Sequence, residues 1–492
     1  MNKIKQGFNW LFYGIFVLVF GYLFLRIFFR DTIHNYTFSQ LLPGFLIGGG
    51  MLALSYYLCR RGSSYLEKHF LPIVLCVLAL FFVGSIYTGY KLRFTPAFDM
   101  DAIYGGALQW LNEGSFPNYY EYMGYFPNNL GGMTFLYIIF KISSLFGCQD
   151  FFAVGMVFNS FLITMTILLG TLICKKLKGS IAGIMAMITF CMFLPFYVLG
   201  AAFYTDSLSM VFPVLFYYLY LIYKEQNDLK NQIGLGVLMA VILTIGMLVK
   251  FTVVIVLIAV LIDSLLNNNL KKTAILGVLC IFIALVGFKG FDASIYGKHM
   301  DKATAEELET PYLHWMMMGL QGNRGYSPED YEYTRSFPAD TRKEACKTRI
   351  QERLQSLGLS GLFTLCTNKA TICFGDGTIA VSDFLDDTPA QSVRLQTYVL
   401  YAGENYAFYQ HISTGYLLAI YFIMVIGVIY TIFVKKDTDA QKVLAPRLCC
   451  MGILAFLLMW ETSSRYITNF VPMLLISAAL AITWIGGKTE NV

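Results

Sequence analysis

Long apolar runs that carry almost no charge constrain the fold of this chain more than any other feature. A transmembrane helix needs about 20 consecutive apolar residues, and runs of that order follow one another along most of the sequence. They lie near residues 8–29, 42–59, 69–90, 151–173, 180–200, 206–223, 231–249, 251–267, 273–290, 412–434, 444–461 and 466–486. The sequence therefore predicts an all-α polytopic membrane protein with about twelve transmembrane helices.

The composition agrees with this fold class. Only 14% of the residues are charged and 57% are hydrophobic, whereas ordinary soluble domains have about 25% charged residues. This excludes a soluble globular protein, a disordered protein and a small disulfide-linked scaffold. The net charge of +5 indicates no nucleic-acid partner, because Lys and Arg in short connectors set the orientation of a chain in the bilayer.

The basic connectors predict which helix ends face the cytoplasm. They contain Lys3 and Lys5, Arg60, Arg61 and Lys68, Lys175, Lys176 and Lys178, Lys224 and Lys230, Lys271 and Lys272, and Lys435, Lys436 and Lys442. We therefore expect a multi-pass protein of the cell membrane with both termini in the cytoplasm. The polar stretches 91–129 and 291–411 then face outward.

The run at 130–147 is short for a span and contains Lys141. It either crosses the bilayer or lies in its outer interface. Counting it as a span would move the connector at 175–178 to the outside, against the trend of the other basic connectors. The sequence therefore favours a helix in the outer interface.

These features divide the chain into four parts. N-terminal transmembrane helices occupy residues 1–68, and a catalytic transmembrane core with a first outer loop at 91–147 occupies 69–290. An extracytoplasmic subdomain at 291–411 and C-terminal transmembrane helices at 412–492 follow. The subdomain is predicted to be small and mixed, with a helix over 341–357 and a β-like stretch at Thr378–Val381 after a turn. Its thiols, those of Cys346, Cys366 and Cys373, form at most one disulfide among themselves or are all free.

Two carboxylates follow the third span. Asp99 and Asp101 are two residues apart in the first outer loop, and this spacing predicts that they lie close together. Such a pair can share a divalent cation, or one member can act as a general base while the other orients the acceptor. The alternative is that both side chains are simply solvated in a polar loop.

Aromatic and amide side chains surround this pair in the sequence. Tyr104, Tyr125, Asn128 and Asn129 offer flat apolar faces together with hydrogen-bonding groups, which suits the binding of a polyhydroxylated ring. An aromatic belt at the membrane interface is the alternative interpretation. His314 is a further candidate contact, although a lone His among aromatic residues and Met is more often structural.

Three ionisable residues stand at other outward turns. Asp206 follows the end of a span and is either a second acid near the site or a helix cap. Lys250 and Arg465 oppose the positive-inside trend and together could clamp a phosphate, with Tyr466 beside them. The alternatives are snorkelling to headgroups, or a Glu461–Arg465 pair on one helix.

Other catalytic motifs are missing from the sequence. It contains no HExxH, no Cys-x-x-Cys, no Walker loop and no GxSxG. These absences argue against a zinc site, a nucleotide-driven pump and a serine hydrolase.

The order of these motifs resembles the glycosyltransferase C superfamily. The resemblance rests on the acidic pair, Tyr125-Phe126-Pro127-Asn128-Asn129, the basic connector Lys175–Gly179, Tyr204-Thr205-Asp206, Lys250, and Glu461 with Arg465-Tyr466 and Pro472. The chain is most similar to the family 39-like integral membrane enzymes, which include protein O-mannosyltransferases and bacterial aminoarabinose transferases. The likeness covers most of residues 69–486.

The resemblance implies a sugar donor on a polyprenyl phosphate and transfer outside the cytoplasm with inversion. Asp99 or Asp101 would then be the catalytic base or the partner of a divalent cation, and Asp206 a second acid. Lys250 and Arg465 would bind the lipid phosphate. The implied partners are the donor lipid, a cell-envelope acceptor that is a glycan, a teichoic acid or a protein, and the bilayer itself.

Two other function classes remain open at the sequence level. A transporter or flippase of a lipid-linked glycan would favour ionisable residues near the membrane midplane and internal inverted repeats. A non-catalytic protein would use 291–411 as a binding or assembly surface.

Overall fold

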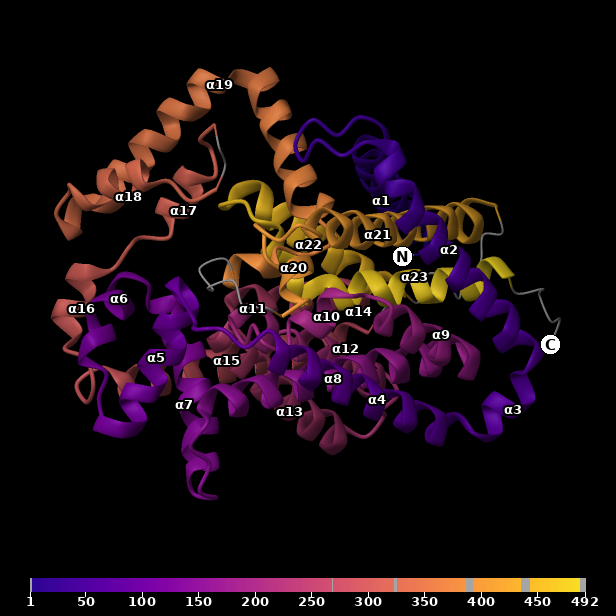
Figure 1. Ribbon diagram of the computed structural model, residues 1–492, viewed down its shortest axis with the longest axis horizontal. Helices are drawn as coiled ribbons and strands as arrows, with labels where there is room; N and C mark the ends of the chain where they lie inside the picture. Colours follow the sequence, from indigo (N-terminus) through magenta and orange to yellow (C-terminus); the bar gives the residue numbers. More distant parts are fainter. Residues whose placement is uncertain (1, 268, 323–324, 386–392, 435–442, 487–492) are drawn as a thin grey trace.

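The computed structural model describes residues 2–267, 269–322, 325–385, 393–434 and 443–486 (Figure 1). In these residues helices and turns make up the fold, and no β-strand forms. The prediction of an all-α polytopic membrane protein is confirmed. The expected cytoplasmic connector with Lys435, Lys436 and Lys442, and the C-terminal residues 487–492, lie outside the described residues.

Nine helical segments of the described residues are long and apolar enough to cross a membrane. They contain α1 (Asn2–Phe29), α2 (Phe38–Arg61), α4 (Phe70–Lys91), α8 (Phe151–Lys178), α11 (Thr205–Leu208) with α12 (Val211–Tyr223), α13 (Leu229–Val249), α15 (Leu270–Ile295), α21 (Tyr406–Val428) and α23 (Val471–Gly486). Three shorter apolar helices are α9 (Ser180–Cys191), α14 (Val254–Leu266) and α22 (Leu444–Met459). Together they occupy the positions of the predicted spans.

The span expected over 180–200 is shorter than predicted. Helix α9 ends at Cys191, and the short α10 (Pro195–Val198) follows it. The cause is Pro195, which has no N–H to donate to the carbonyl of Cys191 four residues earlier. The chain therefore leaves the long helix early and supplies irregular backbone before Tyr204.

The centre of the bundle is formed by the last helix, α23. The segment that contains α23 is buried over its entire apolar window, whereas α15 lies at the periphery and is buried over only 17% of its window. Helices α2 and α21 approach closely at Gly44 and Gly415. A Cβ on Gly44 would lie 2.6 Å from the carbonyl oxygen of Ile412, so only glycine permits this crossing.

One end of the bundle carries most of the remaining helices, and we call it the subdomain end. Figure 1 shows α5 (Phe98–Glu113), α6 (Tyr120–Tyr125), α7 (Leu130–Ser144), α16 (Lys302–Leu308), α17 (Leu313–Met318) and α18 (Pro328–Arg335) gathered there, at the left of the view. The short α3 (Ser63–Lys68) lies at the opposite end. Both stretches predicted to face outward, 91–129 and 291–411, thus contribute to one end.

Helix α19 (Ala339–Gly375) connects this subdomain to the bundle. Its first half contains the helix predicted over 341–357, which is confirmed. At Gly358 the backbone takes a left-handed φ of 55°, and the helix bends. The second half then packs against α1 and α22.

The predicted β-like stretch Thr378–Val381 is wrong. These residues form a turn that leads into a 3₁₀ helix at Val381–Phe384. The carboxylate of Asp376 accepts hydrogen bonds from the backbone N–H groups of Thr378 and Ala380. Ile379 and Ala380 have φ values of 50° and 46°, so the local hydrogen bonds hold a tight turn instead of a strand.

Helix α7 runs across the direction of α4 and α8 in Figure 1. It is followed by Leu145 and Phe146, whose side chains are 79% and 82% exposed. A short helix with an apolar tip that lies across the bundle direction would suit the membrane interface, and this placement of residues 130–147 stays a prediction.

The predicted sidedness can be tested by thiol labelling. All cysteines are free, and Cys148, in the turn between α7 and α8, is exposed. We expect a membrane-impermeant maleimide to label Cys148 in intact cells, because this turn is predicted to face outward. The Cys148→Ser variant should lose that label. Labelling of Cys148 only after cell lysis would reverse the orientation.

Candidate functional site

Helix α5 positions the predicted acidic pair. Asp99 and Asp101 both lie in its first turn, where the helix dipole favours negative charge. Residues two apart on a helix do not face each other, so the two carboxylates have different neighbours. Asp99 contacts Tyr122 and Arg465, whereas Asp101 contacts Tyr119, so the predicted pair shares no hydrogen-bond partner.

Asp99 is the meeting point of three segments that are far apart in the sequence. Tyr122 donates a hydrogen bond of 2.6 Å to its Oδ1 atom. Arg465, 366 residues away, donates from Nη2 to Oδ2 over 3.3 Å, and the Tyr204 hydroxyl lies 3.4 Å from the same oxygen. The Asp99 side chain is 37% exposed, so it is both held in place and accessible from outside.

Asn129 completes the hydrogen bonds around Asp99. Its Nδ2 donates to the Tyr122 hydroxyl over 2.9 Å, and its Oδ1 lies 3.4 Å from the Tyr204 hydroxyl. Burial and the charge of Asp99 raise the pKa of both phenols. Both tyrosines therefore stay neutral and can donate to the carboxylate.

A second ion pair lies beside the first. Lys250, between α13 and α14, contacts the carboxylate of Asp206, which is 1% exposed. The Lys250 ammonium lies 5.2 Å from the centroid of the Tyr466 ring, and the Arg465 guanidinium lies 5.2 Å from the same centroid. Both cations predicted to bind a phosphate thus lie near the ring of Tyr466.

Glu461 is a third carboxylate near these cations. It lies in the non-helical stretch between α22 and the 3₁₀ helix Ser464–Phe470, and it is 9% exposed. Burial raises its pKa, whereas the nearby Arg465 and Lys250 lower it. The alternative of a Glu461–Arg465 pair on one helix is wrong, because no helix joins the two residues.

The reactive cluster therefore contains three acids, two cations and four neutral polar groups. We call it the Asp99–Arg465 cluster, and its members are Asp99, Tyr122, Asn129, Tyr204, Asp206, Lys250, Glu461, Arg465 and Tyr466. Because each cation already faces a carboxylate, the site is close to charge balance before any ligand binds. A phosphate would have to share these cations with the acids.

Asp101 lies on another side of α5. Its Oδ2 is 3.4 Å from the hydroxyl of Tyr119, and burial raises its pKa. Among the described residues, no group of three or more His, Cys, Asp or Glu side chains is arranged to hold a metal ion. The diverging carboxylates do not fit a shared divalent cation, and we derive no step through one.

Four of the predicted contact residues lie outside the cluster. Tyr104 packs its ring against Phe140, Phe152 and Phe203. Tyr125 donates to Glu121, and the Arg335 guanidinium lies 3.6 Å from its ring centroid. Asn128 is exposed and contacts only the edge of the cluster, through Asn129.

His314 is the fourth of these residues. It is 1% exposed, and its Nδ1 lies 2.7 Å from the Thr334 hydroxyl. Burial lowers its pKa to about 4. A neutral, buried imidazole that joins α17 to α18 has a structural role, in line with the alternative interpretation of its sequence context.

Sequence reasoning did not select Tyr122, Tyr204 and Glu461. Tyr122 is one of several tyrosines in the same run, and nothing in the spacing distinguishes it from its neighbours. Tyr204 directly precedes the selected Thr205-Asp206, so its position beside an outward acid was the available signal. Glu461 enters the sequence argument only as part of the motif with Arg465 and Tyr466, or alternatively as a helix partner of Arg465, with no role at the site.

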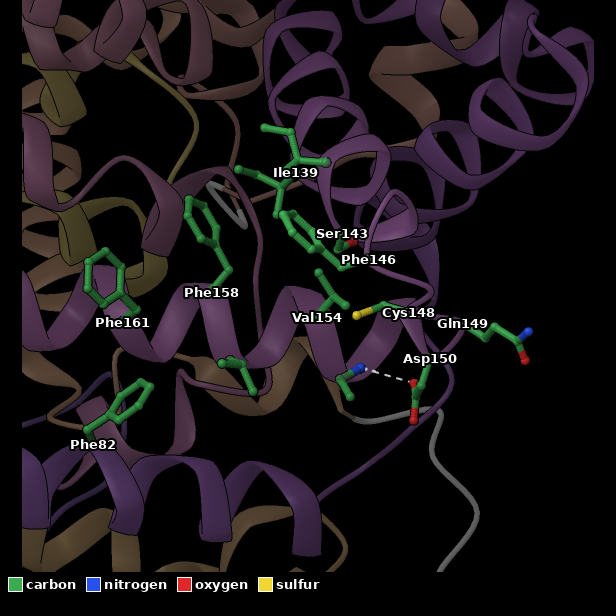
Figure 2. Close-up of a pocket in the computed structure, with 13 residues that line it drawn as sticks. Phe82, Ile139, Ser143, Phe146, Cys148, Gln149, Asp150, Val154, Phe158 and Phe161 are labelled. Carbon is green, nitrogen blue, oxygen red and sulfur yellow. Dashed lines mark hydrogen bonds between the residues drawn. The ribbon is translucent and has the colours of Figure 1, made fainter.

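An apolar groove lies apart from the cluster, between α4, α7 and α8. Figure 2 shows its lining side chains, which are mainly aromatic and aliphatic and include Phe82, Phe146 and Phe158. Its volume is about 820 Å³. Asp150 stands at its rim and forms an ion pair with Arg93. The lining suits lipid chains and offers no set of groups for acid–base chemistry.

The Lys250–Asp206 pair should be important for stability. Replacing Lys250 by Met leaves a buried carboxylate without its partner, which costs about 3–5 kcal/mol. We expect a lower melting temperature of the purified protein in detergent. The double variant Lys250→Met, Asp206→Leu should recover the stability but not the activity. Equal melting temperatures for the wild type and Lys250→Met would contradict this.

Comparisons with known proteins place the chain in a family. Residues 1–484 match the family described as "conserved hypothetical integral membrane protein". No curated protein matches the sequence. A solved structure of the archaeal oligosaccharyltransferase AglB from Archaeoglobus fulgidus, in complex with an inhibitory peptide and a dolichol-phosphate, is similar with a TM-score of 0.46 and 13% identity. That alignment covers 85% of this chain and 50% of that chain, so this chain spans half the length of the archaeal protein. Because the family match covers almost the entire sequence, the chain belongs to this family of conserved hypothetical integral membrane proteins.

Proposed function

We propose that this protein is an integral membrane glycosyltransferase that moves a sugar from a polyprenyl phosphate to a hydroxyl group of an extracytoplasmic envelope acceptor. The observation that carries the proposal is the contact between Asp99 and Arg465, with the Lys250–Asp206 pair beside it. A base next to two cations is the combination that such a reaction needs.

The proposed reaction is a single displacement at the anomeric carbon. The acceptor oxygen forms a bond to this carbon while the bond from carbon to the phosphate oxygen breaks, and its electron pair leaves with the phosphate. The proton of the acceptor hydroxyl passes to the Asp99 carboxylate. One displacement inverts the anomeric configuration.

Asp99 is suited to the role of base because hydrogen-bond donors hold its carboxylate in one orientation. Tyr122 and Arg465 hold one oxygen each, and the partly exposed carboxylate keeps lone pairs for an incoming hydroxyl. General base catalysis of this kind contributes about 10²–10⁴-fold to a rate.

Arg465 and Lys250 would stabilise the leaving phosphate. A guanidinium group has five N–H donors in a planar fork, so Arg465 can bind Asp99 and a phosphate oxygen at the same time. Lys250, whose ammonium lies 5.2 Å from the centroid of the Tyr466 ring, adds a compact positive charge. Negative charge that develops on the phosphate would then be met by cations already in position.

A transfer assay tests the proposal. The purified protein, reconstituted in liposomes, is incubated with radiolabelled polyprenyl-phosphate hexoses and an envelope fraction from cells that lack the protein. We expect label in the envelope fraction and release of polyprenyl phosphate. Movement of the lipid across the vesicle membrane without any transfer or release would instead support the transporter alternative.

A genetic comparison separates catalysis from the binding-surface alternative. If the protein is an enzyme, an Arg465→Ala chain that is inserted normally should fail to complement a deletion strain. Full complementation by Arg465→Ala, together with loss of function on deletion of α16–α18, would support a non-catalytic surface.

A further inference from the structure

Five aromatic side chains from separate segments of the subdomain end form a continuous row. We call them the aromatic row: Tyr326, Tyr331, Phe126, Trp315 and Trp460. Successive ring centroids along the row are 6.5, 6.3, 6.3 and 5.5 Å apart, and the rings of Trp315 and Trp460 are nearly parallel. The row thus joins the loop after α6 and the segments at α17 and α18 to the end of α22.

The row meets the Asp99–Arg465 cluster at Phe126 and at Trp460. The ring centroids of Phe126 and Tyr122 are 5.1 Å apart, and Tyr122 donates to Asp99. Trp460 directly precedes Glu461. Tyr326 continues the row from Tyr331, with ring centroids 6.5 Å apart. A molecule lying on the row would therefore pass, at Phe126, beside the tyrosine that holds Asp99.

The elements that carry the rings are fixed to one another. Arg335 of α18 donates to the carbonyl of Leu308 and to the hydroxyl of Thr310, and Thr310 N–H donates to the Tyr125 carbonyl. Arg353 donates two hydrogen bonds, of 2.8 and 2.7 Å, to the Asp330 carboxylate at the start of α18. Tyr331, on α18, is thus held in one position relative to the segment Tyr122–Asn129.

A buried lysine fixes the other end of the row. Lys369 is 0% exposed and donates to the carbonyls of Gly319, after α17, and Trp460. A Cβ on Gly319 would lie 2.4 Å from the Trp460 carbonyl oxygen, so glycine permits this contact. Rigid elements with fixed rings suit a binding surface, because little conformational freedom remains to be lost on binding.

The chemistry of the row matches a carbohydrate. Tyr326 is 57% exposed, and the other four rings are partly exposed. A sugar ring presents a flat face of C–H groups and a rim of hydroxyls. Aromatic faces cover the first, while the tyrosine hydroxyls and the exposed Asn128 amide offer hydrogen bonds to the second. A lipid chain would need an apolar lining without these polar groups, such as the groove between α4, α7 and α8.

We propose that the aromatic row binds the acceptor and that this acceptor is a glycan, whose terminal hydroxyl is presented to Asp99. This inference rests on the proposed glycosyltransferase function and names the acceptor class for that same site. It makes Tyr326 a residue for acceptor binding, with no role in cleavage of the donor.

Substitution of Tyr326 separates acceptor binding from donor cleavage. When no acceptor is present, we expect water to take its place and to hydrolyse the radiolabelled polyprenyl-phosphate hexose slowly. This hydrolysis breaks the same bond as transfer does, but it needs no acceptor bound to the aromatic row. For Tyr326→Ala we expect kcat/KM for transfer to the envelope fraction to fall about tenfold through a higher acceptor KM, while hydrolysis stays unchanged. The matched control is Tyr312→Ala, also in 291–411 and 55% exposed, which should change neither rate. Unchanged transfer, or an equal fall in both rates, would overturn the acceptor surface.

Pretreatment of the envelope fraction tests the acceptor class. Periodate cleaves sugar rings that carry vicinal diols, and protease removes polypeptide. Label should still enter the protease-treated fraction and should be lost from the periodate-treated one. The opposite pattern would overturn the glycan and indicate a protein acceptor, while the transferase itself would stand. If the wild type neither hydrolyses the donor nor transfers its sugar, the proposed function itself fails.

Discussion

Arg465→Ala is expected to lower the rate of sugar transfer by about 10³-fold, the largest loss that we predict for a single cation. Removal of one donor that stabilises a developing negative charge costs about 10²–10³-fold. Arg465 also holds Asp99 in place over 3.3 Å. Its loss therefore affects the leaving group and the base together.

Two variants show whether the loss of rate is caused by the planar guanidinium group of Arg465. Arg465→Lys keeps the charge but loses the planar donors, so it should recover only a small part of the rate. Arg93→Ala removes another Arg–Asp ion pair, the one with Asp150, and should stay within about twofold of the wild type because such exposed pairs contribute little. The rate is measured as release of polyprenyl phosphate. An Arg465→Ala protein with more than a tenth of wild-type activity would contradict the phosphate role.

Asp99→Asn is expected to lower transfer by about 10²–10⁴-fold, the range of a lost general base. The amide keeps the shape of the side chain and still accepts from Tyr122, so the local fold should persist. Asp101→Asn provides the matched control, because it makes the same change two residues along the same helix. We expect a much smaller effect there, since the carboxylate of Asp101 contacts Tyr119 instead of the cluster.

The double variant Asp99→Asn, Arg465→Ala tests whether the two residues act as one unit. Residues in direct contact show strong coupling in double-mutant cycles, so the combined loss should be far smaller than the product of the single losses. Multiplicative losses would indicate independent roles. A larger defect in Asp101→Asn than in Asp99→Asn would transfer the role of base to Asp101.

Much of the fold follows from the sequence because the bilayer imposes a length and a polarity on each span. The positions of α1, α2, α4, α8 and α13 follow directly from uncharged runs. The errors arise where short-range interactions decide the backbone. Pro195 ends α9 earlier than predicted. Hydrogen bonds to the Asp376 carboxylate stabilise a turn at residues where β-branched side chains suggest a strand.

The site could be predicted in part from charged residues at outward turns, because most Lys and Arg residues lie in the predicted cytoplasmic connectors. Asp206, Lys250 and Arg465 are unusual for their positions, and the structure brings all three into one cluster with Asp99. Tyr104, Tyr125 and His314 could not be excluded in this way. Each lies in an aromatic-rich segment, and which ring faces the carboxylate depends on the packing between elements that are distant in the sequence.

Arg465 and Asp99 are separated by 366 residues, and this has a consequence for how the protein is made. Helices enter the membrane in the order of synthesis, so Asp99 and Lys250 are in place long before the arginine leaves the ribosome. A partly synthesised chain therefore has Asp99 and Lys250 but lacks the guanidinium of Arg465. Under the proposed function, sugar transfer would begin only after the turn before the last helix has been inserted, and it would report the completion of membrane insertion.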